Sequence, residues 1–258
     1  MEYDGRLSVS LREHYEQLAS REIGGFVTDR VRKAAGLFQK HLPGRRRLLD
    51  VGCGVGGVAA YLKTTLAIDE ICGVDIGQET VRAAVQRGVS AVQCDLDSES
   101  LPFGDSYFDA IFAGEVIEHL VYPDHFLQEI RRTLTADGVL VITTPNLASW
   151  SNRILLLCGW QPFETGTSLY HEVGRPRFLR LGDGGGMAGH LRLYTQKALK
   201  ELLQAHRFEI LETAACPAKE GERRSWSWAY APWFLLDQAL TMRPSLGHRM
   251  VIAARPKG

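Results

Sequence analysis

The sequence predicts an α/β fold, in which an open sheet carries helices on both of its faces. Three observations indicate this class. Short apolar runs alternate with segments of helical periodicity along most of the 258 residues. Glycines at alternate positions, Gly52, Gly54 and Gly56, separate the first apolar run from a helix-forming segment. Several apolar runs end in an acidic residue, at the edge where open α/β sheets bind their ligands.

Length and composition fit one globular unit over residues 1–258. The chain is long enough for a single α/β domain with insertions, and it contains 45% hydrophobic and 23% charged residues. The formal net charge is +0, so nothing in the overall charge favours nucleic acid or an anionic membrane as a partner. The composition leaves both a monomer and a homodimer open.

The cysteines and the hydropathy pattern favour a cytoplasmic protein. The five cysteines are scattered and form no C-x-x-C pair, which argues against a disulfide framework or a zinc ribbon. No apolar signal segment follows Met1, and no stretch approaches the roughly 18 apolar residues of a membrane span.

Residues 1–45 are predicted to form two helices over the edge of the sheet. Apolar residues recur there at helical spacing in two groups that Gly24 and Gly25 separate. The arginine triplet at 45–47 follows directly, and we interpret it as a solvated turn, with phosphate binding as the alternative.

Residues 48–62, LLDVGCGVGGVAAYL, read as strand, tight turn and helix. Gly52 and Gly54 let the backbone turn tightly and approach a ligand, and the helix N-terminus offers free N–H groups. The carboxylate of Asp50, inside the strand end, would repel a pyrophosphate but suits a cationic amino group. A dinucleotide-binding or unliganded Rossmann turn is the alternative.

Two further predicted strands, 71–75 and 91–94, also end at acids. Asp75 follows Asp50 by 25 residues, close to the offset of about 20 at which an acid accepts hydrogen bonds from a ribose. Capping of the helix over 78–86 is the alternative role of Asp75. Asp95 follows the third strand.

The remaining predicted elements continue the alternation. A fourth strand, 110–113, leads into Gly114, and an amphipathic helix follows Pro123 and ends at Asp137–Gly138. A buried strand over 139–142, a helix capped by Thr195, and strands over 208–212 and 250–254 complete the predicted set.

The stretch from 48 to 146, about two fifths of the chain, resembles the class I S-adenosylmethionine (SAM) methyltransferases. D-x-G-x-G-x-G resembles their motif I, Asp75 their motif II, and LPFGDSYFD at 101–109 a segment that recurs widely among them. Within this superfamily the chain is similar to the ubiquinone-biosynthesis type of O-methyltransferase. The resemblance implies a Rossmann-like, seven-stranded mixed sheet of order 3-2-1-4-5-7-6 whose last strand is antiparallel.

The same resemblance implies that SAM is the cofactor. The methionine part would lie against the glycine turn, the ribose at Asp75, and the adenine at Asp95 between Cys94 and Leu96. The implied cofactor-binding residues are Asp50, Gly52, Cys53, Gly54, Gly56, Asp75, Ile76, Cys94, Asp95, Leu96, Gly114 and Glu115.

His119 is the candidate catalytic base. It follows the fourth strand at the ligand-binding edge, and an imidazole with an unperturbed pKa near 6.5 can accept the proton of a hydroxyl. The alternative is a histidine that is hydrogen-bonded at a turn.

A metal site is a further prediction. If 115–119 is one helical turn, Glu115, Glu118 and His119 share a face. E-x-x-E-H is similar to the metal motif of the small-RNA 3′-end 2′-O-methyltransferases, in which a distal histidine completes the set, and His190 holds a comparable place here. Such a site would bind a divalent cation such as Mg²⁺ and activate the acceptor oxygens. In methyltransferases without a metal, such glutamates cap turns and the histidine borders the pocket.

Residues 147–190 and 214–248 are predicted insertions that cover the substrate. The first is rich in aromatic residues and ends in a glycine-rich loop at 181–189, which we interpret as a lid with a hinge, or else as a structural subdomain. The aromatic segment Trp226–Phe234 could touch a membrane, cover a substrate or pack on the lid.

The expected function is methyl transfer from SAM to a small molecule, at a hydroxyl of a sugar, a phenol or a natural-product intermediate. One alternative is 2′-O-methylation of an RNA end, against which the neutral charge and the lack of a basic stripe count. The other is a SAM-binding partner subunit without catalysis.

Overall fold

The computed structural model describes residues 27–42, 47–167, 171, 173–176, 189–218 and 231–258. Its strands are β1 (Arg47–Val51), β2 (Glu70–Asp75), β3 (Ser90–Gln93), β4 (Phe108–Gly114), β5 (Leu134–Pro145), β6 (Phe208–Cys216) and β7 (Arg249–Pro256). Its helices are α2 (Asp29–His41), α3 (Gly57–Leu66), α4 (Gln78–Gln86), α5 (Pro123–Thr133), α6 (Trp150–Leu157), α7 (Gln196–Ala205), α8 (Ala231–Thr241) and a 3₁₀ turn, η1 (Ile117–His119).

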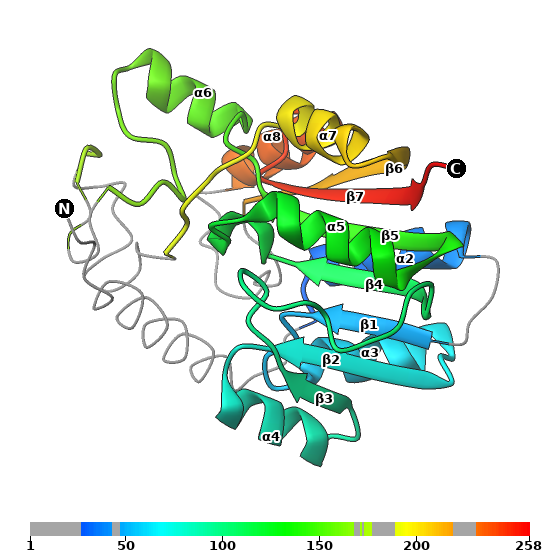
Figure 1. Cartoon of the computed structure of the whole chain (residues 1–258). Helices are drawn as coiled ribbons and strands as arrows, with labels where there is room; N and C mark the ends of the chain where they lie inside the picture. Colours follow the sequence, from blue (N-terminus) through cyan, green and yellow to red (C-terminus); the bar gives the residue numbers. More distant parts are fainter. Residues whose placement is uncertain (1–26, 43–46, 168–170, 172, 177–188, 219–230) are drawn as a thin grey trace.

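The strands form a single seven-stranded sheet of order β3-β2-β1-β4-β5-β7-β6, which confirms the predicted order (Figure 1). Strands β1 to β5 run parallel to one another, and β7 is antiparallel to both β5 and β6. The carboxyl ends of β1, β2 and β4 therefore meet at one edge. The amino end of β7 lies at this edge too, because β7 runs the opposite way.

Each face of the sheet carries its own apolar core. On one face, Phe126 and Ile130 of α5 and Leu199 of α7 pack on the sheet. On the other face, Phe38 of α2 and Leu62 of α3 do so. These two layers hold the sheet rigidly and leave its carboxyl edge to form a site. Among the helices of the described part, none combines the length and the apolar composition that a membrane span would need.

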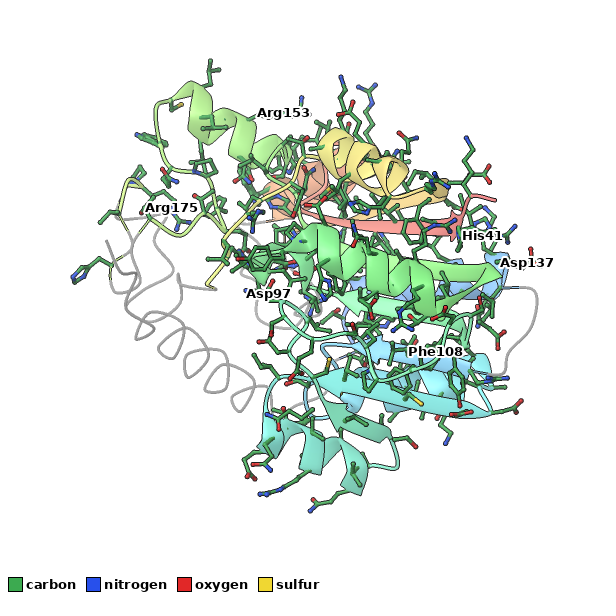
Figure 2. All side chains as sticks on the ribbon, viewed as in Figure 1. His41, Asp97, Phe108, Asp137, Arg153 and Arg175 are labelled. Atoms are coloured by element: carbon green, nitrogen blue, oxygen red, sulfur yellow. The ribbon has the colours of Figure 1, made fainter. Side chains whose placement is uncertain are left out.

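The predicted end of the helix that follows Pro123, at Asp137–Gly138, was wrong, because α5 ends at Thr133. Strand β5 already begins at Leu134, which pairs with Phe108, and a register shift before Ala110 accommodates the extra residues. Figure 2 shows Asp137 at the amino edge of the sheet and Asp97 at the opposite, ligand-binding edge.

Helices α6 and α8, which lie in the two insertions, were not predicted. The described residues exclude the first of the two helices expected within residues 1–45, the glycine loop up to residue 188 and the aromatic segment up to residue 230.

The glycine turn needs its glycines for two different reasons. Gly54 and Gly56 both have positive φ angles, +50° and +80°. A Cβ atom on Gly56 would lie 3.0 Å from the backbone Cα of Ala84 in α4 and 3.1 Å from a methyl group of Val89. A Cβ atom on Gly54 would meet nothing within 4 Å. Gly56 therefore allows α3 to pack closely against α4.

We expect Gly56→Ala to lower the free energy of unfolding by about 2–5 kcal/mol, because left-handed strain and a clash with backbone add together. Gly54→Ala is the matched control. It should lower the free energy of unfolding by only about 1–2 kcal/mol, which is the cost of the left-handed backbone conformation. Urea unfolding of both variants measures the difference. Equal losses would contradict a packing role for Gly56.

Candidate functional site

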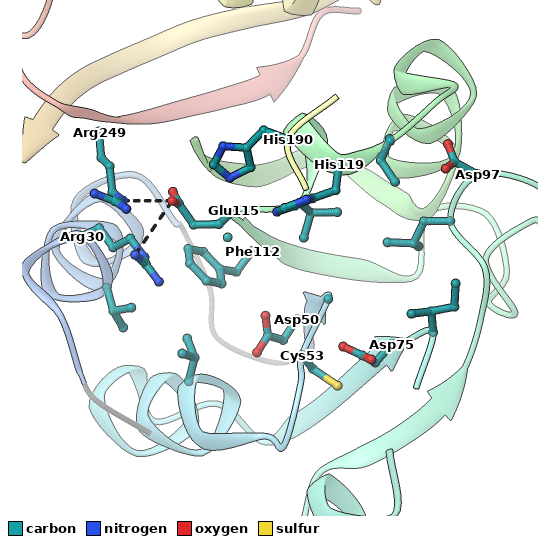
Figure 3. Close-up of a pocket in the computed structure, with 18 of the residues that line it drawn as sticks. Arg30, Asp50, Cys53, Asp75, Asp97, Phe112, Glu115, His119, His190 and Arg249 are labelled. Atoms are coloured by element: carbon teal, nitrogen blue, oxygen red, sulfur yellow. Dashed lines mark hydrogen bonds and ion pairs between the residues drawn. The ribbon is translucent and has the colours of Figure 1, made fainter. Parts of the chain in front are cut away.

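A cavity of about 540 Å³ lies at the carboxyl edge of β1, β2 and β4 (Figure 3). Its size is ordinary for a site that holds a small molecule or a cofactor. The predicted site residues that line it are Asp50, Gly52, Cys53, Asp75, Ile76, Asp95, Leu96, Gly114, Glu115, His119 and His190.

Three residues of the predicted cofactor set do not line this cavity. The backbone N–H of Gly54 donates a hydrogen bond of 2.8 Å to the carboxylate of Asp75. Gly56 begins α3 and packs against α4. Cys94 is buried in the apolar core, with its thiol 3.9 Å from the carbonyl oxygen of Ser100. Each of these residues shapes the surroundings of the cavity instead.

Asp75 fastens the glycine turn to the start of α4. Its Oδ1 accepts hydrogen bonds from the backbone N–H of Gly77 (2.9 Å) and the hydroxyl of Thr80 (2.9 Å). Gly77 is the N-cap of α4, which has no side-chain cap bond, so the capping role considered for Asp75 was wrong. Its Oδ2 accepts from Gly54. A carboxylate oxygen has two lone pairs, so Oδ2 keeps the capacity to accept a hydrogen bond from a ligand in the cavity.

Asp50 carries a buried carboxyl beside that of Asp75. Its Oδ2 has no hydrogen-bond partner within the described residues. Burial, together with the negative charge of Asp75, raises the pKa of Asp50 to about 8. A cationic ligand group at this point would stabilise the ionised form of Asp50, since it would supply the missing opposite charge.

Two more acids lie where β3 ends. The carboxylate of Asp95 accepts hydrogen bonds from the backbone N–H of Asp97 (3.0 Å) and the hydroxyl of Ser98 (2.9 Å). Asp97, which the sequence analysis did not select, also lines the cavity and accepts a hydrogen bond of 2.8 Å from the backbone N–H of Tyr122. Four carboxyl groups thus gather at this end of the cavity.

The opposite end carries guanidinium groups that the sequence analysis missed. Figure 3 shows Arg30, from α2, and Arg249, from the start of β7, both on one side of the Glu115 carboxylate and each joined to it by a dashed line. Arg249 Nε lies 3.0 Å and Arg30 3.9 Å from Glu115 Oε2, and the hydroxyl of Thr143 donates to Oε1 at 3.0 Å. Burial raises the pKa of Glu115, but the two guanidinium groups outweigh it and hold that pKa below its usual value.

The expectation that Glu115 shares a helical face with Glu118 and His119 was wrong. The helical turn contains only Ile117–His119, and Glu115 precedes it with a left-handed φ of +58°. This backbone conformation and the pull of Arg249 direct the carboxylate of Glu115 away from the other predicted metal ligands.

Glu118, His119 and His190 do come together. One ligand atom of each lies within 4.8 Å of those of the other two, and the two imidazole rings are 4.8 Å apart. The Nδ1 of His190 is 2.9 Å from the carbonyl oxygen of Glu164, which can only accept, so Nδ1 carries the proton in the neutral ring. The Nε2 of His190 then has the lone pair and lies 4.0 Å from Glu118 Oε1.

Glu118 is fully buried behind the two histidines. Its Oε2 accepts a hydrogen bond of 2.9 Å from the hydroxyl of Thr144. Burial and the nearby charge of Glu115 raise the pKa of Glu118 well above its usual value, which favours the neutral form of its carboxyl group. Two imidazoles and one carboxylate are a donor set that zinc sites use, so these three residues could hold a metal ion without Glu115.

The raised pKa of Asp50 predicts how stability depends on pH. A carboxyl with a folded-state pKa of about 8, against 3.8 unfolded, binds more protons in the folded state between these values. Its contribution to stability is therefore fully present below pH 4 and is lost as the pH rises towards 8.

We expect the ligand-free protein to lose several kcal/mol more stability than Asp50→Asn does between pH 5 and pH 8.5. Urea unfolding at a series of pH values measures both slopes. Asp137→Asn, at an exposed site in β5, is the control and should keep the wild-type slope. Equal slopes for the wild type and Asp50→Asn would contradict the buried-acid assignment.

Comparison with known proteins finds relatives among the methyltransferases. Residues 49–142 match the family model described as Methyltransferase domain. The fatty-acid O-methyltransferase of Mycolicibacterium smegmatis is 38% identical over 104 residues, which are 38% of this chain and 36% of that protein. The ubiquinone biosynthesis O-methyltransferase of Maricaulis maris is 26% identical over 173 residues, which cover 62% of this chain and 66% of that protein. The chain thus spans between about one third and two thirds of the length of these relatives.

Solved structures show the same fold. The 1,6-didemethyltoxoflavin-N1-methyltransferase of Burkholderia thailandensis, with bound 1,6-didemethyltoxoflavin and S-adenosylhomocysteine, superposes with a TM-score of 0.59. The match covers 100% of this chain and 92% of that one at 17% sequence identity, so it bears on the fold alone. The chain thus has the class I methyltransferase fold, and its residues 49–142 match the methyltransferase domain.

Proposed function

We propose that the protein transfers a methyl group from SAM to a hydroxyl group of a small molecule. The observation that carries this proposal is the division of one cavity into two ends. One end holds the carboxyl groups of Asp50 and Asp75, with Asp95 and Asp97 also in the lining, and the other holds His119, His190, Arg30, Arg249 and the carboxylate of Glu115 (Figure 3). The first end suits a ligand with positive charge and hydroxyl donors, and the second suits the group that is to be methylated.

The residues at the acidic end fit SAM. The uncompensated carboxyl of Asp50 lies where a cationic methionine part would pass Gly52, and Asp75 has an oxygen that can accept from a ribose hydroxyl. Asp95 and Leu96 line the remainder of this end, beside the place for an adenine ring. When bound, SAM supplies a methyl group on a positively charged sulfur.

The histidines of the other end can accept the proton that a hydroxyl acceptor must lose. The Nδ1 of His119 is buried, which leaves Nε2 as the ring nitrogen that can face the cavity. His119 would take the acceptor's proton at Nε2. The lone pair of His190 Nε2 lies close to His119 and can accept a hydrogen bond from the ring once it is protonated.

The predicted divalent cation remains a separate proposal. Glu118, His119 and His190 would be its ligands, and its chemistry would be to lower the pKa of the acceptor hydroxyl. The cavity favours a small-molecule acceptor over the alternative of an RNA end. Arg30 and Arg249 are both paired with Glu115, so neither guanidinium group is left to neutralise an RNA phosphate. A partner subunit without catalysis would bind SAM but transfer no methyl group.

We expect Asp75→Ala to weaken the binding of S-adenosylhomocysteine by about 1–3 kcal/mol, because a buried acceptor of ligand hydrogen bonds is lost. Thr80→Val is the matched control, since it removes the contacts of the Thr80 hydroxyl with Asp75 and with the carbonyl oxygen of Gly77 but leaves the Asp75 carboxylate in place. Isothermal titration calorimetry compares the two with the wild type. Unchanged affinity in Asp75→Ala would show that Asp75 only fastens the glycine turn to α4.

We expect His119→Ala to lower methyl transfer by about 10²–10⁴-fold while the affinity for S-adenosylhomocysteine stays the same. The assay uses radiolabelled SAM and a panel of phenols, sugars and other hydroxyl compounds. Repeating it after exhaustive chelation separates the two roles of the cluster: full activity would exclude the metal and retain His119 as the base. Binding without transfer to any acceptor would overturn the catalytic proposal.

A further inference from the structure

Helices α6 and α8 present apolar side chains to solvent. From α6 and the residues after it, Ile154, Leu156, Leu157 and Trp160 are exposed. From α8 and the residue after it, Trp233, Leu235, Leu236 and Met242 are exposed. Leu157 is 87% exposed and Leu235 66%. Exposed apolar side chains that gather in this way mark an interaction site more often than scattered ones do. We call these eight residues the α6–α8 surface.

The two helices form a single unit. The ring of Trp150 in α6 lies 4.5 Å from that of Trp233 in α8, and its indole N–H donates a hydrogen bond of 2.8 Å to Asp237 of α8. Asp237 is only 3% exposed and also accepts from the backbone N–H of Ala218. The single acid of α8 therefore points inward and holds the helices together, and its charge does not reach the outer face.

The charges that remain at this surface are positive. Over 150–160 and 231–243 the charged residues are Arg153, Arg243 and the buried Asp237. Both arginines are exposed, and Figure 2 shows Arg153 on α6. Within the described residues 150–160 and 231–243, exposed apolar side chains thus lie with two exposed arginines and no exposed acid.

We propose that the α6–α8 surface binds the face of an anionic lipid membrane. Leucine, tryptophan and methionine side chains would enter the boundary between headgroups and acyl chains, and the two guanidinium groups would pair with lipid phosphates. The protein would lie on the membrane, because no described helix is built to cross it.

Charge complementarity favours a membrane over a second copy of the chain. In a two-fold contact, the same surface meets itself. Arg153 and Arg243 would then face a surface that offers no exposed carboxylate in 150–160 or 231–243, and like charges would approach each other. An anionic membrane supplies both the apolar phase and the opposite charge.

Vesicle flotation of the full-length protein tests this proposal. We expect binding to vesicles that contain phosphatidylglycerol, with much weaker binding to vesicles of phosphatidylcholine alone. The double variant Arg153→Ala/Arg243→Ala should bind the anionic vesicles at least about tenfold more weakly, since each surface arginine contributes. The double variant Leu157→Glu/Leu235→Glu should no longer float.

A matched control separates this surface from apolar exposure in general. Val85 in α4 is 52% exposed beside β3, at the far end of the sheet, and Val85→Glu should float as the wild type does. Binding of S-adenosylhomocysteine by the variants checks their fold. The proposal is overturned if the wild type stays with the soluble fraction, if Val85→Glu loses binding equally, or if light scattering shows a dimer that Leu157→Glu/Leu235→Glu disrupts while vesicles do not bind.

Discussion

The cavity depends on the way the glycine turn is fastened to the end of β2. The backbone N–H groups of Gly52 and Cys53 both donate to the carbonyl oxygen of Val74, at 2.8 and 3.0 Å, and Gly54 donates to the carboxylate of Asp75. These bonds fix where α3 begins and bring the Asp50 and Asp75 carboxyl groups near each other in a buried place. Burial and this proximity disfavour the ionised form of Asp50 and raise its pKa to about 8 in the ligand-free state. A cationic ligand would stabilise that ionised form, so the arrangement is preorganised for such a ligand.

The acidic and basic ends of the cavity have different electrostatic designs. At the acidic end, Asp50 lacks a protein partner for one buried oxygen, and a ligand must provide the opposite charge. At the other end, Glu115 and Glu164 already compensate Arg249, so little net charge remains there. Glu118 is buried and favours its neutral form. The histidines therefore face a nearly neutral environment, which suits proton transfer better than the binding of a strongly charged acceptor.

Local sequence signals were sufficient for the sheet and for most of the acidic end. Strands that end in an acid, with a glycine turn after the first of them, place Asp50, Asp75 and Asp95 at one edge by topology alone. The strand order came from the resemblance to a family. The direction of Glu115 could not be predicted, because it depends on a left-handed backbone angle and on Arg249, which lies 134 residues further along the chain. Arg30 and Glu164 were missed for the same reason, since long-range contacts bring them to the cavity.

The position of β7 has a consequence for the order in which the molecule assembles. This strand lies between β5 and β6, and its first residue, Arg249, is the partner of Glu115. During synthesis, β6 has no strand in the sheet to pair with until residues 249–256 have been added, and β5 keeps an open edge until then. The buried carboxylate of Glu115 also lacks its main counter-charge during that time. The basic end of the cavity is thus completed last, after all the strands of the acidic end have been synthesised.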